Sequence, residues 1–220
     1  MSYTNKLNNY QGDCDIMLGN YTKFSDYIKW FNQYLRHEEN VGKLIGVDLG
    51  AGPFGCNSRL LDNVLLDGCD ADADVVATLP KDIYRNVFQY RFGVGEKLPY
   101  EDSSLDVVVN SCMIQHLNSA VELEVGVAEM ARVLKPEGHA YMMFKVGTHD
   151  TLFTHWNNYY SEERTFRVFS PASMVELAEK YDLDVVNKDL LVDDNWIIYC
   201  CLVFQREVDV ADGSIDDTQN

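Results

Sequence analysis

The feature that most constrains the fold is an apolar run that ends in a glycine-rich turn, VDLGAGPFG at residues 47–55. Gly50, Gly52 and Gly55 have the spacing G-x-G-x-x-G, which is typical of the turn between a buried strand and a nucleotide-binding helix. Glycines let the backbone approach a ligand closely, and the first N–H groups of the helix are free to bind an anion. One such turn is a weak signal, so its neighbours must decide which ligand it holds.

The rest of the chain alternates between strand patterns and helix patterns. Strands alternating with helices favour a parallel sheet that is covered by helices on both faces. The last two strand patterns are separated by VDDN alone, so one of them is expected to run antiparallel. We therefore predict an α/β fold, a doubly wound, mostly parallel seven-stranded sheet with one antiparallel strand near the end. The predicted strands are residues 43–52, 64–70, 87–94, 104–111, 139–144, 183–191 and 196–204.

Helical periodicity is clearest in two segments. Residues 22–38 carry apolar side chains at the spacing of a single helix face. A second helix is expected to begin at Ser119, because Glu122 follows three residues later and the two form a capping box. Pro136 and Gly138 are expected to stop that helix.

The net charge restricts the partners. The chain has 18 basic and 35 acidic residues, which gives −17. A field of that sign repels phosphate backbones and anionic membranes, so nucleic acid is a disfavoured partner. It favours a cationic cofactor or substrate, or it serves solubility alone. Residues 206–220 are acidic and poor in large apolar side chains, and we expect them to form a disordered tail.

Hydropathy and cysteine spacing indicate a cytoplasmic protein. We find no window of about 18 consecutive apolar residues, and expect no membrane span. Residues 1–13 lack the basic and apolar segments of a secretory leader. No cysteine pair has the spacing C-x-x-C, so we expect no bound zinc or other metal and a reducing compartment. The six cysteines are Cys14, Cys56, Cys69, Cys112, Cys200 and Cys201.

Three neighbouring features argue against a nicotinamide dinucleotide. Asp48 would repel a pyrophosphate held by the turn, whereas it could pair with the ammonium group of a sulfonium amino acid. The other two are LPYEDSSLDVVVNSCMIQHL at 98–117 and EMARVLKPEGHAYMMF at 129–144. With these blocks the chain, over roughly residues 44–145, resembles the class I methyltransferases that use S-adenosylmethionine. The resemblance is to the small-molecule branch related to ubiquinone and menaquinone methyltransferases, and it implies a Rossmann-like fold.

The resemblance implies roles for the first two strand ends. Gly50 and Gly52 would let the chain pass over the cofactor, and Asp48 would hold the methionine ammonium group, directly or through water. Asp70 would accept hydrogen bonds from both ribose hydroxyls, because a carboxylate can accept two at once. Asp72 is the alternative for that role.

The turn GVGEKLPY at 93–100 resembles the family's adenine-binding turn, with a departure at Val94. The family often has an Asp there, so the adenine amine would meet Glu96 or a backbone carbonyl instead. Gly95 would still offer its N–H. The full set of cofactor-binding residues that the resemblance implies is Asp48, Gly50, Gly52, Asp70, Ala71, Val94, Gly95, Glu96, Asn110 and Ser111.

His116 is the candidate catalytic residue. In several small-molecule members of the family, a histidine at this place faces the acceptor and acts as a general base. Its ordinary pKa suits that task. The alternative is a residue at the start of a helix that packs or binds a carbonyl, and the sequence leaves both roles open.

The acceptor site is expected in the parts that lie outside the three blocks. The segment 145–170 is rich in aromatic residues, which suit a small-molecule pocket or a cation cage, or simply a packed cap. With the front cap 1–42 it would complete a single domain, 1–205. The candidate acceptor-binding residues are Tyr21, His155, Trp156 and Tyr160.

The sequence thus predicts an enzyme that transfers a methyl group from S-adenosylmethionine to a small-molecule acceptor by in-line displacement. Two alternatives stay open: an RNA or protein methyltransferase, and a homologue that binds the cofactor without catalysis. Whether the methyl group goes to oxygen, nitrogen, sulfur or carbon is left open, as is the oligomeric state.

Overall fold

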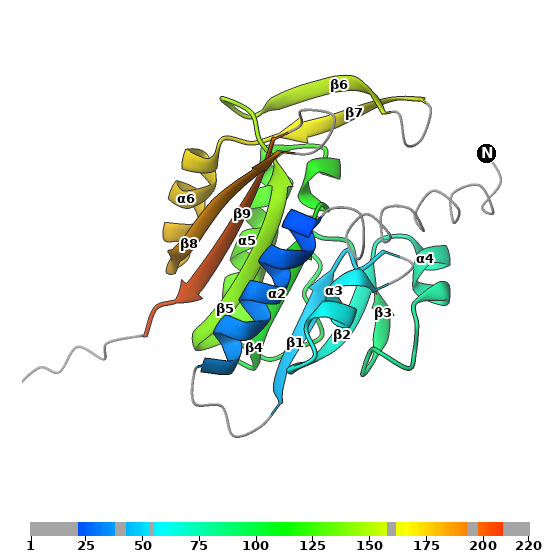
Figure 1. Cartoon of the computed structure of the whole chain (residues 1–220), viewed down its shortest axis with the longest axis vertical. Helices are drawn as coiled ribbons and strands as arrows, with labels where there is room; N and C mark the ends of the chain where they lie inside the picture. The colour runs from blue at the N-terminus through cyan, green and yellow to red at the C-terminus, as the bar shows by residue number, and fades with distance from the viewer. Residues whose placement is uncertain (1–21, 38–42, 53–54, 158–161, 193–197, 209–220) are drawn as a thin grey trace, which may run out of the picture.

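A twisted seven-stranded sheet forms the centre of the protein, in the order β3-β2-β1-β4-β5-β9-β8 (Figure 1). The computed structural model describes residues 22–37, 43–52, 55–157, 162–192 and 198–208. The strands are β1 (Leu44–Leu49), β2 (Val64–Asp70), β3 (Val87–Gln89), β4 (Leu105–Ser111), β5 (Leu134–Lys145), β8 (Leu183–Val192) and β9 (Ile198–Arg206). Two further strands, β6 (Thr151–Asn157) and β7 (Glu162–Val168), form a separate hairpin.

The sheet confirms the predicted fold class. The pairs β1–β2, β1–β4, β2–β3 and β4–β5 are parallel. Strand β9 runs antiparallel to both of its neighbours, β5 and β8. The antiparallel strand is therefore β9, which lies second from the edge, and the fold is a Rossmann-like α/β sheet.

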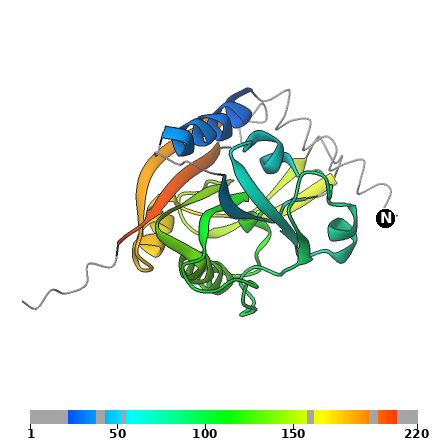
Figure 2. The same cartoon turned by 90° about the horizontal axis from the view of Figure 1, so that it is seen from below.

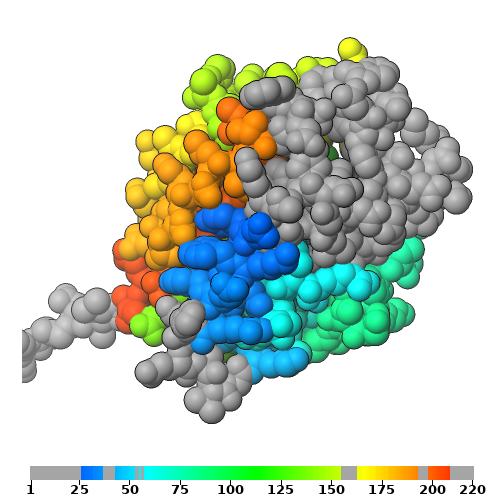
Figure 3. Space-filling view, in the orientation of Figure 1, coloured from blue at the N-terminus to red at the C-terminus, as the bar shows by residue number. Residues whose placement is uncertain are grey.

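Helices cover both faces of the sheet (Figure 2). On one face, α2 (Thr22–His37) packs Ile28, Phe31 and Leu35 against the sheet, and α3 (Cys56–Leu60) lies beside it. On the other face, α5 (Ala120–Val133) and α6 (Pro171–Glu179) pack against the sheet. The short helices α4 (Ala73–Thr78) and η2 (Ile114–His116) follow β2 and β4. Figure 3 shows α2 on the surface beside β8.

Alternation along the strands explains this two-sided core. In β5, Ala140, Met142 and Phe144 belong to the core under α5, while Tyr141 and Met143 belong to the core under α2. Successive side chains of a strand point to opposite faces, so a central strand that is covered on both sides must be apolar throughout. Burial of this kind fixes the register.

The Ser119 cap at the start of α5 and the end of that helix before Pro136 agree with the prediction, whereas the strand that follows begins earlier than predicted. The Glu122 N–H donates to the Ser119 Oγ at 3.2 Å, and the Glu122 carboxylate accepts from the Asn118 N–H at 2.9 Å. The helix ends at Val133, and β5 begins at once and passes through Pro136. A register shift in the β4–β5 pairing accommodates this stretch, so β5 begins at Leu134 rather than at the predicted residue 139, and Pro136 lies inside the strand.

The segment after β5 forms an antiparallel hairpin at the carboxyl end of the sheet (Figure 1). Arg167 of β7 fastens it, because its guanidinium donates to the backbone carbonyls of Leu117 and Asn118 and pairs with Asp150 at 2.9 Å. Within the described residues, no helix has the length and apolar character needed to cross a membrane.

Two glycines in the loop after β3 give a matched test of the packing. Gly93 and Gly95 have φ values of 81° and 86°. A Cβ on Gly93 would lie 2.1 Å from the Glu122 carbonyl oxygen, whereas a Cβ on Gly95 meets nothing within 4 Å. We expect Gly95→Ala to lower the free energy of unfolding by about 1–2 kcal/mol through backbone strain. We expect Gly93→Ala to lower the free energy of unfolding by about 1–3 kcal/mol more than Gly95→Ala does, because of overpacking.

Urea denaturation of both variants without added ligand measures the difference. Equal losses would show that α5 moves aside at no cost and that the contact of this loop with α5 does not constrain the fold.

Candidate functional site

The carboxyl ends of β1, β2 and β4 meet where the strand order reverses, and ligands bind at that place in sheets of this type. The turn after β1 is bound to the end of β2. The N–H groups of Gly50 and Ala51 both donate to the Cys69 carbonyl, at 3.0 and 2.9 Å, and the Gly52 N–H donates to the Asp70 carboxylate at 3.2 Å. The turn and the acid of the next strand thus form one unit.

The glycines of this turn have different tasks. Gly50, with φ 71°, is in close contact with Met113: a Cβ on Gly50 would lie 2.4 Å from the Met113 Cγ. Gly52, with φ 61°, faces open space, as does Gly95. Gly52 and Gly95 therefore offer the bare backbone that a bound ligand needs.

The hydrogen bonds of Asp70 and Asp72 distinguish these two candidates for the ribose-binding acid. Asp72 caps α4, where its carboxylate accepts from the Asp74 N–H at 2.9 Å. Asp70 accepts one backbone hydrogen bond on each oxygen, from the N–H groups of Gly52 and Asp72. Burial raises the pKa of Asp70 above its ordinary value, and the charge of Asp72 adds to the rise. Each oxygen of Asp70 keeps a further lone pair for a ligand hydroxyl.

Asp48 has no exposed surface. Its two oxygens accept from the Asn57 amide at 2.8 Å and from the Tyr84 hydroxyl at 2.7 Å. Burial raises its pKa to about 6; the hydrogen bonds from Tyr84 and Asn57 oppose this, and the charge of Asp70 adds to it. Asp48 therefore lies beneath the turn, and both predicted routes to a ligand, direct and through water, stay predictions.

Polar atoms without a hydrogen-bond partner in the structure lie at the end of β4 and in η2. Asn110 is fully buried, and among the described residues neither its amide nitrogen nor its amide oxygen has a partner. Gln115 is 5% exposed, and its Oε1 has no partner in that part of the chain either. Ser111, in contrast, donates to Asn57 at 2.9 Å. Buried polar groups cost free energy unless they are satisfied, so these atoms fit a site that a polar ligand completes.

The predicted adenine-binding turn lies at the surface next to this site. Val94, Gly95 and Glu96 are exposed, and the Glu96 carboxylate accepts from the Arg91 N–H at 3.4 Å. The carbonyl of Ala71 accepts from the Gln89 side chain at 2.9 Å. The binding roles of these residues stay predictions.

His116 lies under the β6–β7 hairpin. Its ring meets Phe166 edge-on, with centroids 5.4 Å apart. Packing of protein atoms around the imidazole, with the nearby charges of Arg164 and Lys145, lowers the pKa of His116 to about 4, although the residue itself is exposed. The imidazole is therefore neutral near pH 7, and neutral imidazole is the form that can accept a proton or a hydrogen bond.

The four predicted acceptor-binding residues are not fully described. Tyr21 and Tyr160 lie outside the described residues. In the hairpin, the backbone of His155 pairs with that of Arg164, and the backbone of Trp156 pairs with that of Glu163. The structure describes the backbones of His155 and Trp156 but not their side chains. Their roles stay predictions.

Sequence reasoning assigned no role to four residues that shape this region: Asn57, Tyr84, Gln115 and Lys145. Gln115 and Lys145 are polar residues at the end of apolar blocks, and that signal could have singled them out. Asn57 and Tyr84 give no such signal, because their partner Asp48 is 9 and 36 residues away along the chain.

Comparison with known proteins agrees with this geometry. Residues 47–142 match the family model of the methyltransferase domain. The chain is 34% identical over 92 residues to an uncharacterized protein of Haemophilus influenzae, covering 40% of this chain and 33% of that protein. It is 29% identical over 105 residues to the demethylmenaquinone methyltransferase of Chlorobaculum parvum, covering 48% of this chain and 42% of that protein. The chain thus spans less than half the length of these curated relatives.

Solved structures share the fold at low identity. A methyltransferase of Methanosarcina mazei that depends on S-adenosylmethionine (SAM) has a TM-score of 0.62 and 15% identity, covering 79% of this chain and 97% of that one. The 1,6-didemethyltoxoflavin-N1-methyltransferase of Burkholderia thailandensis, solved with its acceptor and S-adenosylhomocysteine, has a TM-score of 0.63 and 14% identity. It covers 93% of this chain and 87% of that one.

The buried Asp48 predicts an unusual pH dependence of stability. Its native pKa of about 6 lies above the value near 4 of an unfolded chain. Between these values the native state binds the additional proton, so this group makes stability fall as pH rises from 4 to 6, by up to about 3 kcal/mol. Urea titrations measure the free energy of unfolding of the wild type and of Asp48→Asn. We expect the wild-type value minus the variant value to decrease as pH rises from 4 to 6.

Tyr84→Phe supplies a directional control. It removes a hydrogen bond that favours the ionised carboxylate, so it should move the decrease to higher pH. A difference curve that is flat, or that rises with pH, would show that Asp48 ionises normally.

Proposed function

We propose that the chain, whose residues 47–142 match the family model of the methyltransferase domain, transfers a methyl group from S-adenosylmethionine to a small-molecule acceptor. The observation that carries the proposal is the unit formed by the glycine turn, Asp70 and the unpartnered Asn110 amide, at the point where the strand order reverses. These residues fit a ligand that carries hydroxyl, ammonium and carboxylate groups together.

Different residues would bind different parts of the cofactor. Asp70 would accept the ribose hydroxyls, and the bare backbone at Gly52 would lie against the cofactor. The amides of Asn110 and Gln115, which can donate and accept, would meet the polar amino-acid end. Asp48 acts through Asn57, which also holds Ser111 at the end of β4. Asp48 is thus a positioning residue.

The chemistry requires orientation more than covalent help. When bound, S-adenosylmethionine supplies an activated methyl group on a sulfonium sulfur. The new bond forms from an electron pair of the acceptor, and the electron pair of the broken bond stays on sulfur. The chain must hold the acceptor in line and exclude water. We infer that the hairpin β6–β7, fastened by Arg167 over η2, does this.

The small-molecule class is supported by two relatives. The named activities of the Chlorobaculum and Burkholderia proteins are methylation of demethylmenaquinone and of a didemethyltoxoflavin. The net charge of −17 disfavours RNA as the acceptor. In this proposal residues 1–205 form one domain, with the front cap 1–42 and the segment 145–170 around the acceptor.

Calorimetric titration tests the cofactor. We expect micromolar binding of S-adenosylmethionine and S-adenosylhomocysteine, and none of the oxidised nicotinamide dinucleotide. Asp70→Asn should weaken binding of both ligands by about tenfold or more, because hydrogen bonds to a charged group contribute about 1.5–3 kcal/mol each.

The matched control is Asp72→Ala. It removes the cap of α4 and should cost about 1 kcal/mol of stability, with the affinity within about twofold of the wild type. The reverse pattern, with affinity lost in Asp72→Ala and kept in Asp70→Asn, would show that Asp72 rather than Asp70 binds the ribose hydroxyls. Binding of the dinucleotide alone would overturn the proposed function.

His116 is the proposed proton acceptor where the acceptor atom carries a proton. NMR titration of its ring should give a pKa near 4. Arg164→Gln and Lys145→Met should each raise it, because each removes a positive charge beside the ring. Lys81→Met, which removes a charge elsewhere, should leave it unchanged. A pKa that stays the same in both the Arg164 and the Lys145 variant would show that the two cations do not face the imidazole.

A further inference from the structure

Asp48 of β1 and Asp67 of β2 are both buried carboxylates, but their partners differ in charge. Asp67 is 2% exposed and forms an ion pair with Arg85 at 2.6 Å. Asp48 has no exposed surface and accepts hydrogen bonds from two uncharged groups, the Asn57 amide and the Tyr84 hydroxyl. Among the described residues, no basic side chain forms an ion pair with Asp48. The acid beneath the glycine turn therefore lacks the counter-charge that the acid on the neighbouring strand has.

The missing counter-charge makes the ionised form of Asp48 unfavourable. A buried carboxylate without a cation costs free energy, and protonation removes that cost. Burial accordingly raises the pKa of Asp48 to about 6. In Asp67 burial acts in the same direction, but the hydrogen bonds from Arg85, Tyr100 and Asn86, together with the Arg85 charge, hold the pKa below its ordinary value. The contrast between the two acids thus follows from one guanidinium group.

A cation bound at the glycine turn would supply the counter-charge that Asp48 lacks. When bound, S-adenosylmethionine brings a sulfonium and an ammonium group against one carboxylate, so it is a net cation. We propose that this cofactor replaces the proton of Asp48: its binding releases the proton of the carboxyl group to solvent, and the carboxylate that remains attracts the cofactor. The inference rests on the proposed binding of S-adenosylmethionine. It requires no direct contact, because charges in a buried site interact over several ångströms.

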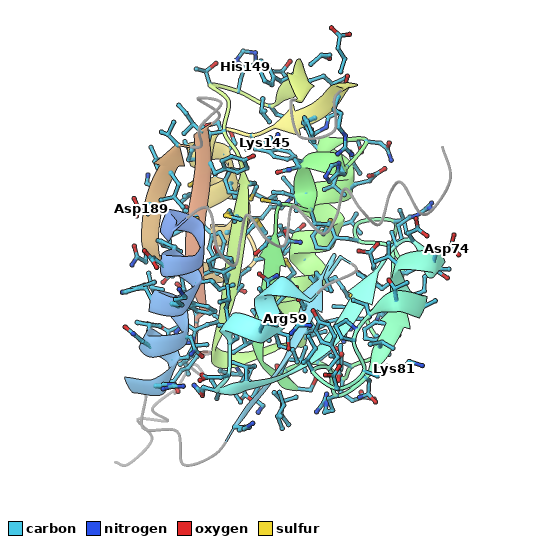
Figure 4. All side chains as sticks on the ribbon, turned by 45° about the vertical axis from the view of Figure 1, so that its right-hand side comes forward. Arg59, Asp74, Lys81, Lys145, His149 and Asp189 are labelled. Carbon is cyan, nitrogen blue, oxygen red and sulfur yellow. The ribbon has the colours of Figure 1, made fainter. Side chains whose placement is uncertain are left out.

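The titratable groups that face Asp48 are Cys69 and Asp70 of β2 and Tyr84, which precedes β3. Burial raises the pKa of the Cys69 thiol and of the Tyr84 hydroxyl well above their ordinary values, so both stay neutral near pH 6. On α3 the charged residue is Arg59, which is exposed and acts on Tyr84 (Figure 4). The residues of β4 that pair with β1 carry no charge. Asp70, whose pKa burial also raises, is therefore the competing source of a proton among the described groups.

The sign of the pH dependence follows from these charges. The bound cation stabilises the ionised carboxylate, so the pKa of Asp48 is lower in the complex than its value of about 6 in the free protein. Between the two values binding releases a proton, and the affinity for the cofactor falls as the pH falls. Above the free value Asp48 is already ionised, and the affinity no longer depends on this group.

Calorimetry at several pH values tests the inference. We expect the Kd of S-adenosylmethionine to be about tenfold higher at pH 5 than at pH 7, because one proton must leave. Titrations at pH 5.5 in two buffers of different ionisation enthalpy should show the release of about 0.7 proton per bound cofactor. Asp48→Asn has no proton to release. Its Kd should change less than about twofold over this range, with a release below about 0.2 proton.

A neutral probe separates Asp48 from Asp70. 5′-Methylthioadenosine has the adenine and the ribose of the cofactor but lacks the amino acid and the sulfonium charge. A proton that leaves Asp70 when the ribose binds would be released by both ligands, whereas a proton from Asp48 would be released by the cation alone. We expect the probe to release less than about 0.2 proton at pH 5.5.

Asp189→Asn is the matched control, because it makes the same change at an exposed position on β8, at the far edge of the sheet (Figure 4). It should release as much proton as the wild type. Tyr84→Phe keeps the test decisive if Asp48→Asn fails to fold. It removes a hydrogen bond that favours the ionised Asp48, so its proton release at pH 6.5 should exceed that of the wild type.

Three results would each overturn the inference: no proton release with S-adenosylmethionine at pH 5.5, equal release with 5′-methylthioadenosine, or an unchanged release in the Asp48 and Tyr84 variants. Cofactor binding at pH 7.5 together with any of these results would leave the proposed methyl transfer standing. Absence of cofactor binding at pH 7.5, where Asp48 is ionised, would instead overturn the proposed function and the inference together.

Discussion

The attachment of the glycine turn to the end of β2 is the constraint on which the site depends. Gly50 and Ala51 share the Cys69 carbonyl, and Gly52 donates to the Asp70 carboxylate. Cys69 is itself in register with Leu49 of β1, so the turn cannot shift unless the β1–β2 pairing breaks. The same bonds orient Asp70, whose other oxygen is fixed by the Asp72 N–H. Strand pairing therefore fixes the Asp70 carboxylate beside the backbone of Gly52 before any ligand binds.

A buried polar network beneath this turn couples it to the neighbouring elements. Asp48 of β1 binds Asn57 of α3 and Tyr84, and Asn57 accepts from Ser111 of β4. Burying a carboxylate is unfavourable unless its hydrogen bonds are satisfied, and here both oxygens have partners. The network therefore links the ends of β1 and β4 through a helix that is five residues long. A helix this short has little stability of its own, so tertiary contacts of this kind must hold it in place.

The sequence predicted the sheet well because local patterns carry that information. Apolar runs and the capping box of α5 located the elements, and the short gap before the last strand indicated the antiparallel β9. The predicted start of β5 at residue 139 was wrong, because a register shift allows Pro136 to lie inside β5, and no local pattern encodes that pairing. Of the site, the glycines, Asp70 and Asn110 were predicted from the motif. The Asn57–Asp48–Tyr84 contacts were not, since they join residues that are distant in sequence.

The net charge of the chain and the charged groups near the site act over different distances. A chain of net charge −17 favours cations at long range, where all its charges act together. Inside a site, distances are a few ångströms and screening by salt is weak, so individual groups dominate. Asp48 and Asp70 lie at the carboxyl ends of β1 and β2. A cofactor that carries a positive charge would thus lie near these two acidic side chains, and their effect on it does not depend on the charge of the whole chain.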